Sequence, residues 1–447
     1  MKDMIKLGKK LFPICRSLTG NGNLRTLKII KSKIPNLKIK KIKSGTKVYD
    51  WKIPSEWNIN DAYIKDKFGK KIIDFKVNNL HLVNYSMPIK KRIITKSKLY
   101  KHLYYIKELP NAVPYVTSYY KKYWGFCLTY KQKKIIDNTY KKNDVFEVCI
   151  DSTFKNNGVM HYGELILPGK NKDDKEEILI STYICHPSMA NNELSGPLVA
   201  TALAKNFSNK KLKKTLRILF ISETIGSIAY INKNLKKLKK NIIGGYVLTC
   251  IGDTRNYSYL KTKYGNSPSD IAAKKAFKEL NIKYKKYSFL ERGSDERQYN
   301  APGVDFKIGS IMRSKYGSYK EYHTSLDNFN LVKREGLLGG YKIAKKAILH
   351  LMNYNKKNVE RKINRQHLNP ISQITCEPNL GKRGLYNLIS NLKFGHDSMR
   401  PISKNILNFL QYADGTNNLR DISKYIKLSI KKTTFTYHFL KKIRLVK

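Results

Sequence analysis

The chain has 447 residues, 41% of them hydrophobic, and this length predicts two or three globular domains rather than one small core. The formal net charge is +55, but lysine is spread along nearly the whole chain with abundant Ile, Asn and Tyr, as an AT-rich coding sequence would produce. The charge therefore predicts no specific nucleic-acid site, although anionic partners stay open. The sequence has no run of about 18 apolar residues, which excludes an ordinary membrane-spanning helix.

The N-terminal segment and the cysteines both indicate a reducing compartment. The segment MKDMIKLGKKLFPICRSLTG has charges within its apolar stretch and no small-residue cleavage site, so we expect a cytoplasmic protein. The six cysteines are scattered without a CxxC pair and predict buried thiols rather than disulfides. We interpret Cys185 as such a thiol, because within a strand its side chain would point to the face opposite that of His186.

Three regions that differ in composition and hydrophobic pattern follow one another along the chain. Residues 1–40 show helix-like spacing of Leu and Ile, and residues 41–130 are rich in Tyr, Trp and β-branched residues between prolines, which predicts a small β-rich inserted domain. From residue 144 to about 353, strands alternate with helices, from VFEVCIDSTF to VKREGLLGGYKIAKKAILHLM. The prediction is an α/β fold in which residues 1–40 and 131–354 form a mixed, mainly parallel sheet with helices on both faces.

A charged connector at residues 355–366 precedes a separate C-terminal unit, which we place at residues 368–447. Three short helical segments, ISKNILNFLQYADG, NLRDISKYIKL and SIKKTTFTYHFLKK, are followed by a strand-like end. This order is typical of a winged helix-turn-helix. Lys431 and Lys432 could meet phosphates, but in a chain whose mass lies mostly elsewhere we favour a unit that binds a protein partner or self-associates.

Three polar side chains directly follow predicted strands, and a fourth lies in a polar loop. EILISTYIC leads into His186, TLRILFIS into Glu223 and GGYVLTCIG into Asp253, and the loop KEYHTSLDN carries His323. The carboxyl ends of strands in an open α/β sheet form the crevice in which ligands bind. His, Glu and Asp are also the residue types that zinc and its general base require. These positions predict a metal-assisted active site.

Several motifs together carry a family resemblance: CHPSMANNELSG, VYDWKIPSEW, SETIGSIAY, CIGDTRNYSY, RGSDERQYNAPGVD and EYHTSLDN. With them the chain resembles the co-catalytic zinc aminopeptidase superfamily, and more closely its bacterial aminopeptidase-like branch associated with surface-polysaccharide gene clusters. The similarity covers residues 1–353, and the C-terminal unit is similar to the winged-helix-like module of that branch.

The superfamily holds two zinc ions bridged by an aspartate, with a glutamate that activates the bridging water. By this resemblance His186 and Asp253 are ligands of one metal, His323 is a ligand of the other, and Glu223 is the catalytic general base. The implied cofactor is Zn²⁺, as one or two ions.

Two departures from the superfamily pattern bear on the number of metals. Where the superfamily has an aspartate followed by an asparagine, this chain has Asn192 and Glu193, and where it has two glutamates, Thr224 follows Glu223. A neutral amide is a weak bridge between two dications, so one zinc ion is the more cautious prediction. Asn192 and Glu193 remain candidate ligands, with Glu193 as an alternative to His323.

The segment RGSDERQYNAPGVD corresponds to the one in which superfamily members place substrate-contacting residues. Asp295, Glu296 and Arg297 are therefore candidates for holding a free amine or a carboxylate, with a solvated turn as the alternative. Tyr322, next to His323, is a candidate for the pocket wall, with simple packing as the alternative.

Three functions follow from these observations. The leading prediction is a zinc-dependent aminopeptidase-like hydrolase that cleaves a peptide or related amide bond of a small substrate, in surface-polysaccharide biosynthesis. The second is a catalytically altered binding or assembly protein of glycan synthesis that kept the peptidase fold, which Asn192 and Thr224 motivate. A DNA-binding regulator, suggested by the charge and the C-terminal helices, ranks last, and we do not expect nucleic acid to be the partner.

Overall fold

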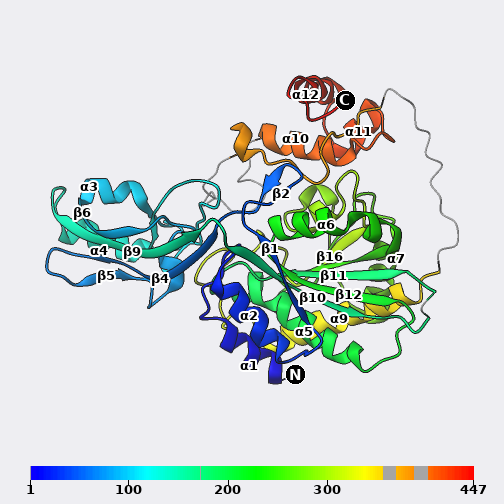
Figure 1. The fold of residues 1–447 in the computed structure, drawn as a ribbon, viewed down its shortest axis with the longest axis horizontal. Helices are drawn as coiled ribbons and strands as arrows, with labels where there is room; N and C mark the ends of the chain where they lie inside the picture. The colour runs from blue at the N-terminus through cyan, green and yellow to red at the C-terminus, as the bar shows by residue number, and fades with distance from the viewer. Residues whose placement is uncertain (1, 172, 356–368, 387–400) are drawn as a thin grey trace.

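The computed structural model describes residues 2–171, 173–355, 369–386 and 401–447, so the predicted connector at residues 355–366 lies almost wholly outside the described residues. Figure 1 shows a main α/β body, an elongated β-rich extension and a group of helices near the C-terminus. Among the described residues, no helix is long and apolar enough to cross a membrane.

The main body is built on an eight-stranded sheet in the order β1 (Lys38–Lys43), β10 (Val159–Leu167), β12 (Thr215–Ile221), β11 (Glu177–Tyr183), β13 (Ile242–Leu248), β16 (Ile308–Met312), β14 (Ser258–Leu260) and β15 (Lys285–Tyr287). The central strands β12, β11, β13 and β16 run parallel, whereas β1, β10 and β14 each pair antiparallel with a neighbour. Because β11, β12 and β13 end at the same edge, the polar residues that follow them are brought together there.

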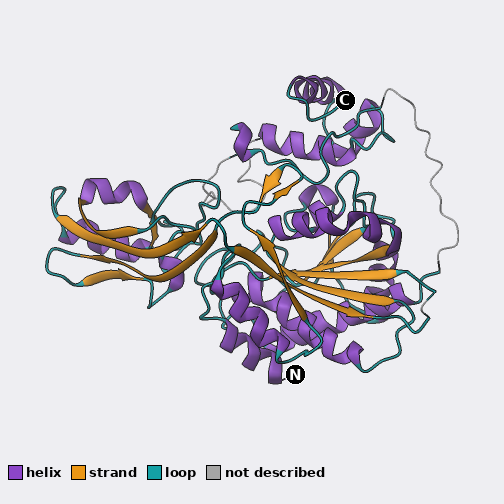
Figure 2. Ribbon diagram, in the orientation of Figure 1, coloured by secondary structure: helices purple, strands orange, loops and turns teal. Residues whose placement is uncertain are grey.

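Helices cover both faces of this sheet (Figure 2). Alternate residues of β11 divide between two hydrophobic clusters, with Ile178 and Ile180 in the first and Leu179 in the second. The second cluster contains residues of α6 (Ile225–Asn241) and the short α8 (Glu296–Tyr299). The first contains residues of α1 (Lys2–Leu11), α2 (Asn21–Lys31), α5 (Ser195–Ser208), α7 (Pro268–Glu279) and α9 (Arg334–Met352). The predicted α/β class, with helices on both faces, is confirmed.

The β-rich extension is a four-stranded antiparallel sheet in the order β5 (Lys71–Asp74), β4 (Glu56–Lys65), β9 (Val145–Lys155) and β6 (Ile89–Thr95). The sequence pattern groups residues 145–155 with the strands of the main sheet, but β9 pairs with β4 and β6 instead. Burial at Phe146, Val148 and Ile150 alternates with exposed or half-buried positions, as in an antiparallel sheet that is covered on one face.

Short elements complete these two parts. Two helices accompany the extension, α3 (Lys96–Leu99) and α4 (Tyr130–Thr139). The short strands are β2 (Lys47–Val48), β3 (Trp51–Lys52), β7 (Leu103–Tyr104) and β8 (Phe126–Cys127), and the 3₁₀ helices span Asn79–His81, Tyr100–His102, Phe289–Glu291 and Gly381–Arg383.

The C-terminal unit contains the three expected helices, α10 (Pro401–Tyr412), α11 (Leu419–Ile426) and α12 (Ile430–Lys442). Asn418 caps α11, which explains why that helix begins there. The chain then returns in extended form, because Val446 bridges antiparallel to Ser372. A third hydrophobic cluster joins the unit to the main body, and Ile406 of α10 shares it with Tyr316.

The start of α5 lies so close to the end of β13 that position 196 has no room for a side chain. A Cβ on Gly196 would lie 2.2 Å from the carbonyl oxygen of Leu248 and 2.3 Å from Oγ1 of Thr182. Gly196→Ala is expected to lower the free energy of unfolding by about 1–3 kcal/mol, because the helix has to move off the sheet. Denaturant unfolding measures this, with Gly226→Ala as the control, since a Cβ there meets nothing closer than 3.2 Å. Equal losses in the two variants would contradict the packing argument.

Candidate active site

A cavity of about 270 Å³ at the carboxyl ends of β11 and β12 has walls from all three parts of the chain. His186 and Glu223 come from the main body, Tyr119 and Tyr120 from the segment after β7, and Leu380 from the C-terminal unit. Two larger hollows, of about 740 and about 720 Å³, are lined by other residues. We take the smaller cavity as the candidate active site because it contains two of the strand-end residues.

His186 is held by a carboxylate from the turn that follows β11. Its Nδ1 lies 2.7 Å from Oε2 of Glu193, and its Nε2 lies 3.6 Å from Oε2 of Glu223. Burial lowers the pKa of His186, but the hydrogen bond and the charge of Glu193, together with the charge of Glu223, outweigh burial, so the pKa is raised overall. The contact fixes the imidazole ring and leaves its Nε2 on the side of Glu223.

Glu193 reaches His186 from a π-helical turn, Ala190–Leu194, directly before α5. Such single widened turns often occur at functional sites. The carboxylate of Asp327 supports the turn by accepting hydrogen bonds from the backbone N–H groups of Asn191 and Asn192. Sequence reasoning missed both the turn and Asp327, because a widening by one residue leaves no periodic pattern.

The guanidinium of Arg16 adds a third charge to this buried group. Its Nε lies 3.4 Å from Oε1 of Glu193 and donates a hydrogen bond of 2.9 Å to the backbone oxygen of His186. The side chain is completely buried, and burial lowers the pKa of Arg16 against the opposing charge of Glu193. Sequence reasoning missed Arg16 as well, and the one hint was a lone arginine in the apolar stretch FPICRSLTG.

Glu223 follows β12 and lies in the cavity wall, where its side chain is 22% exposed. Ser294 Oγ donates a hydrogen bond of 2.7 Å to Oε1 of Glu223. Burial raises the pKa of Glu223, while His186 and Ser294 act in the opposite direction. A carboxyl group with a raised pKa beside an imidazole is suited to take up a proton and to return it.

His323 lies beside His186, with the two ring centroids 5.5 Å apart. Tyr322 stacks on it at 3.9 Å, and Tyr115 meets it edge-on at 5.3 Å. Its Nε2 is buried and has no hydrogen-bond partner among the described residues. Burial and the neighbouring His186 hold the pKa of His323 well below its usual range, so the ring is neutral. A neutral imidazole with an unpaired nitrogen is what a metal ligand requires.

Asp253 is engaged away from this group. Its carboxylate accepts hydrogen bonds from the N–H and the Oγ of Ser314, from the N–H of Arg255 and from the side chain of Asn191. The reason is local: β13 ends at Leu248, and the chain continues past the strand end before it reaches Asp253. The contacts therefore give Asp253 a part in holding its loop and do not pair it with His186.

Asn192, where the resemblance places the bridging carboxylate, turns its amide into the protein. Its Nδ2 donates to the hydroxyl of Tyr183 at 2.9 Å and lies 3.7 Å from Sγ of Cys250. Thr249 Oγ1 lies 2.5 Å from the same Tyr183 hydroxyl. An amide, a phenol, a thiol and a hydroxyl thus meet at this point, none of them the anionic oxygen that a second dication prefers.

Cys185 departs from its expected place. Its Sγ lies 4.0 Å from Nδ1 of His186, because β11 ends at Tyr183 and the strand alternation that would turn the thiol away no longer applies. In the described part of the chain, Cys185, His186 and Glu193 form the one group of three ligand-type side chains within 4.8 Å of one another. Burial raises the pKa of the Cys185 thiol well above its usual range, which keeps it protonated and a poor ligand.

The donor set fits one metal ion better than two. The imidazoles of His186 and His323, with the unpaired Nε2 of His323, are of the type that holds a single zinc ion. Asn192 and Thr224 offer no charge for a second ion, and Glu193 is already paired with a guanidinium.

The predicted substrate contacts at the start of α8 divide into two kinds. Asp295 accepts hydrogen bonds from the N–H of Thr224 at 2.7 Å and from Ser227 Oγ at 2.8 Å, and so holds the start of α6. Burial, aided by the charge of Glu223, raises the pKa of Asp295 to about 7. Arg297, in contrast, lies in the cavity wall.

Glu296 and Tyr322 also pack within the protein. Glu296 is fully buried and accepts hydrogen bonds from the N–H groups of Gly293 and Ser294 and from the hydroxyl of Tyr316. The ring of Tyr322 supports His323 by stacking. Of the four candidates, Arg297 is the one that lines the cavity.

Comparisons with known proteins agree with this architecture. Residues 5–355 match the family model described as "Domain of unknown function (DUF4910)", and residues 369–447 match a winged helix-turn-helix model, which confirms that prediction. A relative from Clostridium acetobutylicum, named "Putative polysaccharide biosynthesis protein with aminopeptidase-like domain", is 41% identical over 100% of this chain and 96% of its own length.

Solved structures give the same result for the fold. A crystal structure of a putative peptidase from Clostridium acetobutylicum is 38% identical, covers 100% of this chain and 96% of its own, and has a TM-score of 0.74. A zinc aminopeptidase from Bacillus subtilis covers 78% of this chain and 93% of its own, with a TM-score of 0.55 at 11% identity. The second likeness shows a shared fold and no more.

Glu193→Gln is expected to lower the pKa of His186, because burial is then opposed by the charge of Glu223 without that of Glu193. In the wild type the raised pKa means that this pair stabilises the fold fully below about pH 6.5, the unfolded value, and that the contribution is lost as the pH rises through the folded pKa. Imidazole NMR titration of chelator-treated protein measures the shift. The difference in unfolding free energy between the wild type and Glu193→Gln should decrease with rising pH. An unchanged pKa of His186 in the variant would contradict the contact between His186 and Glu193.

Proposed function

We propose, from the premise that this chain belongs to the family described as "Domain of unknown function (DUF4910)" and has the fold of zinc aminopeptidases, that it is an aminopeptidase-like hydrolase of an amide bond. The observation that carries the proposal is the position of Glu223, a partly buried carboxyl group 3.6 Å from His186 within a small cavity. The name of the relative from Clostridium acetobutylicum supports a substrate from polysaccharide biosynthesis.

Glu223 is the general base and acid of the proposed reaction. It takes a proton from the attacking water and gives it to the nitrogen of the leaving amine. Ser294, which donates to Oε1, holds the carboxylate in one orientation, so that Oε2 is left toward His186. The small cavity limits the amount of water around the reacting groups.

His186 and His323 would hold one zinc ion, with Glu193 orienting His186 from behind. Such an ion supplies a polarised water and a Lewis acid for the amide carbonyl. In this proposal Asp253 keeps its loop contacts, and Asn192 does not act as a bridging ligand.

Glu223→Gln is expected to lower the turnover number by at least about 100-fold, because a neutral amide cannot accept the proton. A panel of aminoacyl p-nitroanilides, assayed by release of nitroaniline in the presence of zinc, measures the loss. Zinc content should be retained, since two histidines remain. Full activity in this variant would remove Glu223 from the proposed role.

A second candidate function is a binding or assembly protein of glycan synthesis that kept the fold and lost the chemistry. Asn192 favours it, because by the sequence resemblance it replaces a bridging carboxylate, and its amide is engaged by the Tyr183 hydroxyl and the Cys250 thiol.

Elemental mass spectrometry of the purified protein separates the two functions. The hydrolase predicts about one zinc per chain, lost in His186→Ala and retained in His350→Ala, whose imidazole pairs with Glu279 at the surface. A protein that takes up no metal even when zinc is supplied would favour the binding function.

A further inference from the structure

The C-terminal unit forms one wall of the candidate active site. Glu377, Leu380, Tyr386 and Leu407 line the same cavity as Glu223. The unit is therefore placed where it can contact a bound substrate.

Asp50, in the turn between β2 and β3, holds the first part of this unit, which includes the 3₁₀ helix Gly381–Arg383. Its carboxylate accepts hydrogen bonds from the N–H of Asn379 at 2.7 Å and from Arg383, and it pairs with Lys382. Next to it, the indole N–H of Trp51 donates to the backbone oxygen of Glu377 at 2.8 Å. These contacts fix residues 377–383 at the cavity.

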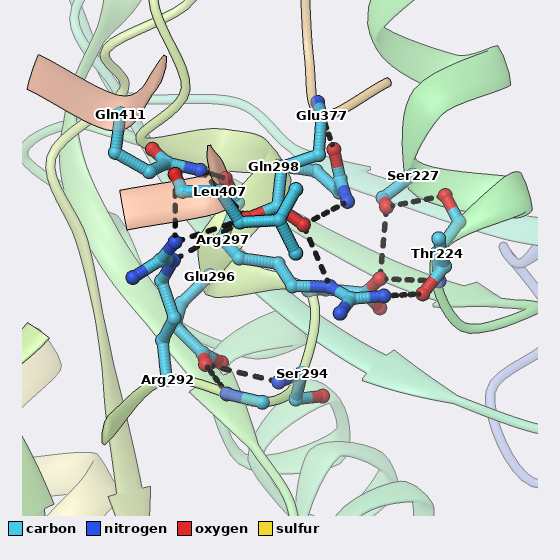
Figure 3. Close-up of polar contacts among 12 residues, drawn as sticks. Thr224, Ser227, Arg292, Ser294, Glu296, Arg297, Gln298, Glu377, Leu407 and Gln411 are labelled. Carbon is cyan, nitrogen blue, oxygen red and sulfur yellow. Dashed lines mark hydrogen bonds and ion pairs between the residues drawn. The ribbon is translucent and has the colours of Figure 1, made fainter. Parts of the chain in front are cut away.

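Glu377 is the point at which the C-terminal unit meets α8 and the loop before it (Figure 3). Its buried carboxylate accepts a hydrogen bond of 2.9 Å from Gln411 of α10 and one of 3.3 Å from Arg292, and its Oε2 lies 3.4 Å from Nε of Arg297. The backbone N–H of Glu377 donates to the side chain of Gln298 at 2.9 Å.

Arg297 is held at two ends, with Glu377 on one side and the start of α6 on the other. Its Nη2 donates to Oγ1 of Thr224 at 2.8 Å, as Figure 3 shows, and Thr224 directly follows Glu223. The side chain of Arg297 keeps 24% of its surface exposed in the cavity wall. The guanidinium thus lines the same cavity as Glu223, the proposed general base, and its donors are not all used by the protein.

We propose that Arg297 is a catalytic residue that binds the carbonyl oxygen of the scissile amide, and that Glu377 of the C-terminal unit is its positioning residue. The proposal rests on the hydrolase function given above. As the water oxygen adds to the carbonyl carbon, the electron pair of the C=O bond moves to the oxygen, and Arg297 hydrogen-bonds the resulting anion. Glu223 takes the water proton and delivers it to the nitrogen as the C–N bond breaks.

The position of Thr224 explains why a fixed cation is useful here. By the sequence resemblance, Thr224 stands in place of a carboxylate that would bind a second metal, and in this chain its hydroxyl accepts a hydrogen bond from a guanidinium instead. A preorganised cation that faces developing negative charge is among the strongest contributions to catalysis. The winged-helix unit then acts as a part of the enzyme that keeps this cation in place.

Arg297→Gln is expected to lower kcat for aminoacyl p-nitroanilides by roughly 100-fold with little change in KM, the loss typical of one oxyanion donor. Arg297→Lys keeps the charge but not the planar guanidinium, so its kcat should lie between those of the wild type and Arg297→Gln. Added guanidinium ion should raise kcat of Arg297→Ala, whereas sodium chloride at equal concentration should not. A wild-type kcat in Arg297→Gln would overturn the proposal.

Glu377→Gln tests the positioning role against a matched control. Asp414→Asn makes the same change of carboxylate to amide in the C-terminal unit and removes its ion pair with Lys263 of the main body, away from the cavity. Both variants should be less stable, but Glu377→Gln alone should lower kcat. Because Glu377→Gln still contains Arg297, added guanidinium ion should raise its kcat only weakly. Equal losses of kcat in the two variants would mean that Glu377 stabilises the fold and does not position Arg297.

Binding of an aminophosphonate separates this inference from the hydrolase proposal. Its tetrahedral anion resembles the oxyanion, and isothermal titration calorimetry measures its affinity without turnover. If the wild type hydrolyses none of the amides, the proposed function fails, yet a loss of at least about tenfold in phosphonate affinity in Arg297→Gln still supports anion binding by Arg297. Equal affinity in the two proteins would overturn it.

Discussion

One buried carboxylate, that of Glu193, lies between an imidazole and a guanidinium, and the architecture of the site depends on it. It orients His186 from the turn before α5 and neutralises Arg16 of the N-terminal segment. Asn84 of the β-rich extension in turn donates to the backbone oxygen of Arg16 at 3.1 Å. A charge buried in this way is stable only with its partners in place, so the N-terminal segment, the extension and the strand end are fixed by a single requirement.

Carboxylates are concentrated at the site, although the chain as a whole is strongly basic. The formal net charge is +55, yet Glu193, Glu223, Asp295 and Glu377 lie within the cavity wall or directly behind it. Each is buried or partly buried and is matched by a cation or by hydrogen-bond donors. The burial of like charges is why the pKa of Asp295 is raised to about 7, and it is the kind of perturbation that marks functional sites.

The parts of this arrangement that repeat along the sequence could be predicted from it. Alternation of strands and helices gave the α/β class, and strand ends gave His186 and Glu223, because both follow from periodicity and from the common edge of parallel strands. Arg16 could not be predicted, since its partner lies 177 positions further along the chain and no pattern links them.

Other differences arose where regular structure ends. Asp253 and Cys185 were placed by extending strand geometry beyond Leu248 and Tyr183, where it no longer holds. The assignment of β9 depended on pairing partners, and the same alternating residues can join either of two sheets.

The passage of the chain from β9 into β10 has a mechanical consequence. The two strands belong to different sheets, and the turn between them is short, from Lys155 to Val159. At this turn the side chain of Glu56 accepts a hydrogen bond of 2.9 Å from the N–H of Val159, so the extension and the main body share a stiff junction. The segment that carries Tyr119 and Tyr120 meets the main body a second time, where Pro114 bridges antiparallel to Thr324, so two separate connections hold this wall of the cavity in place.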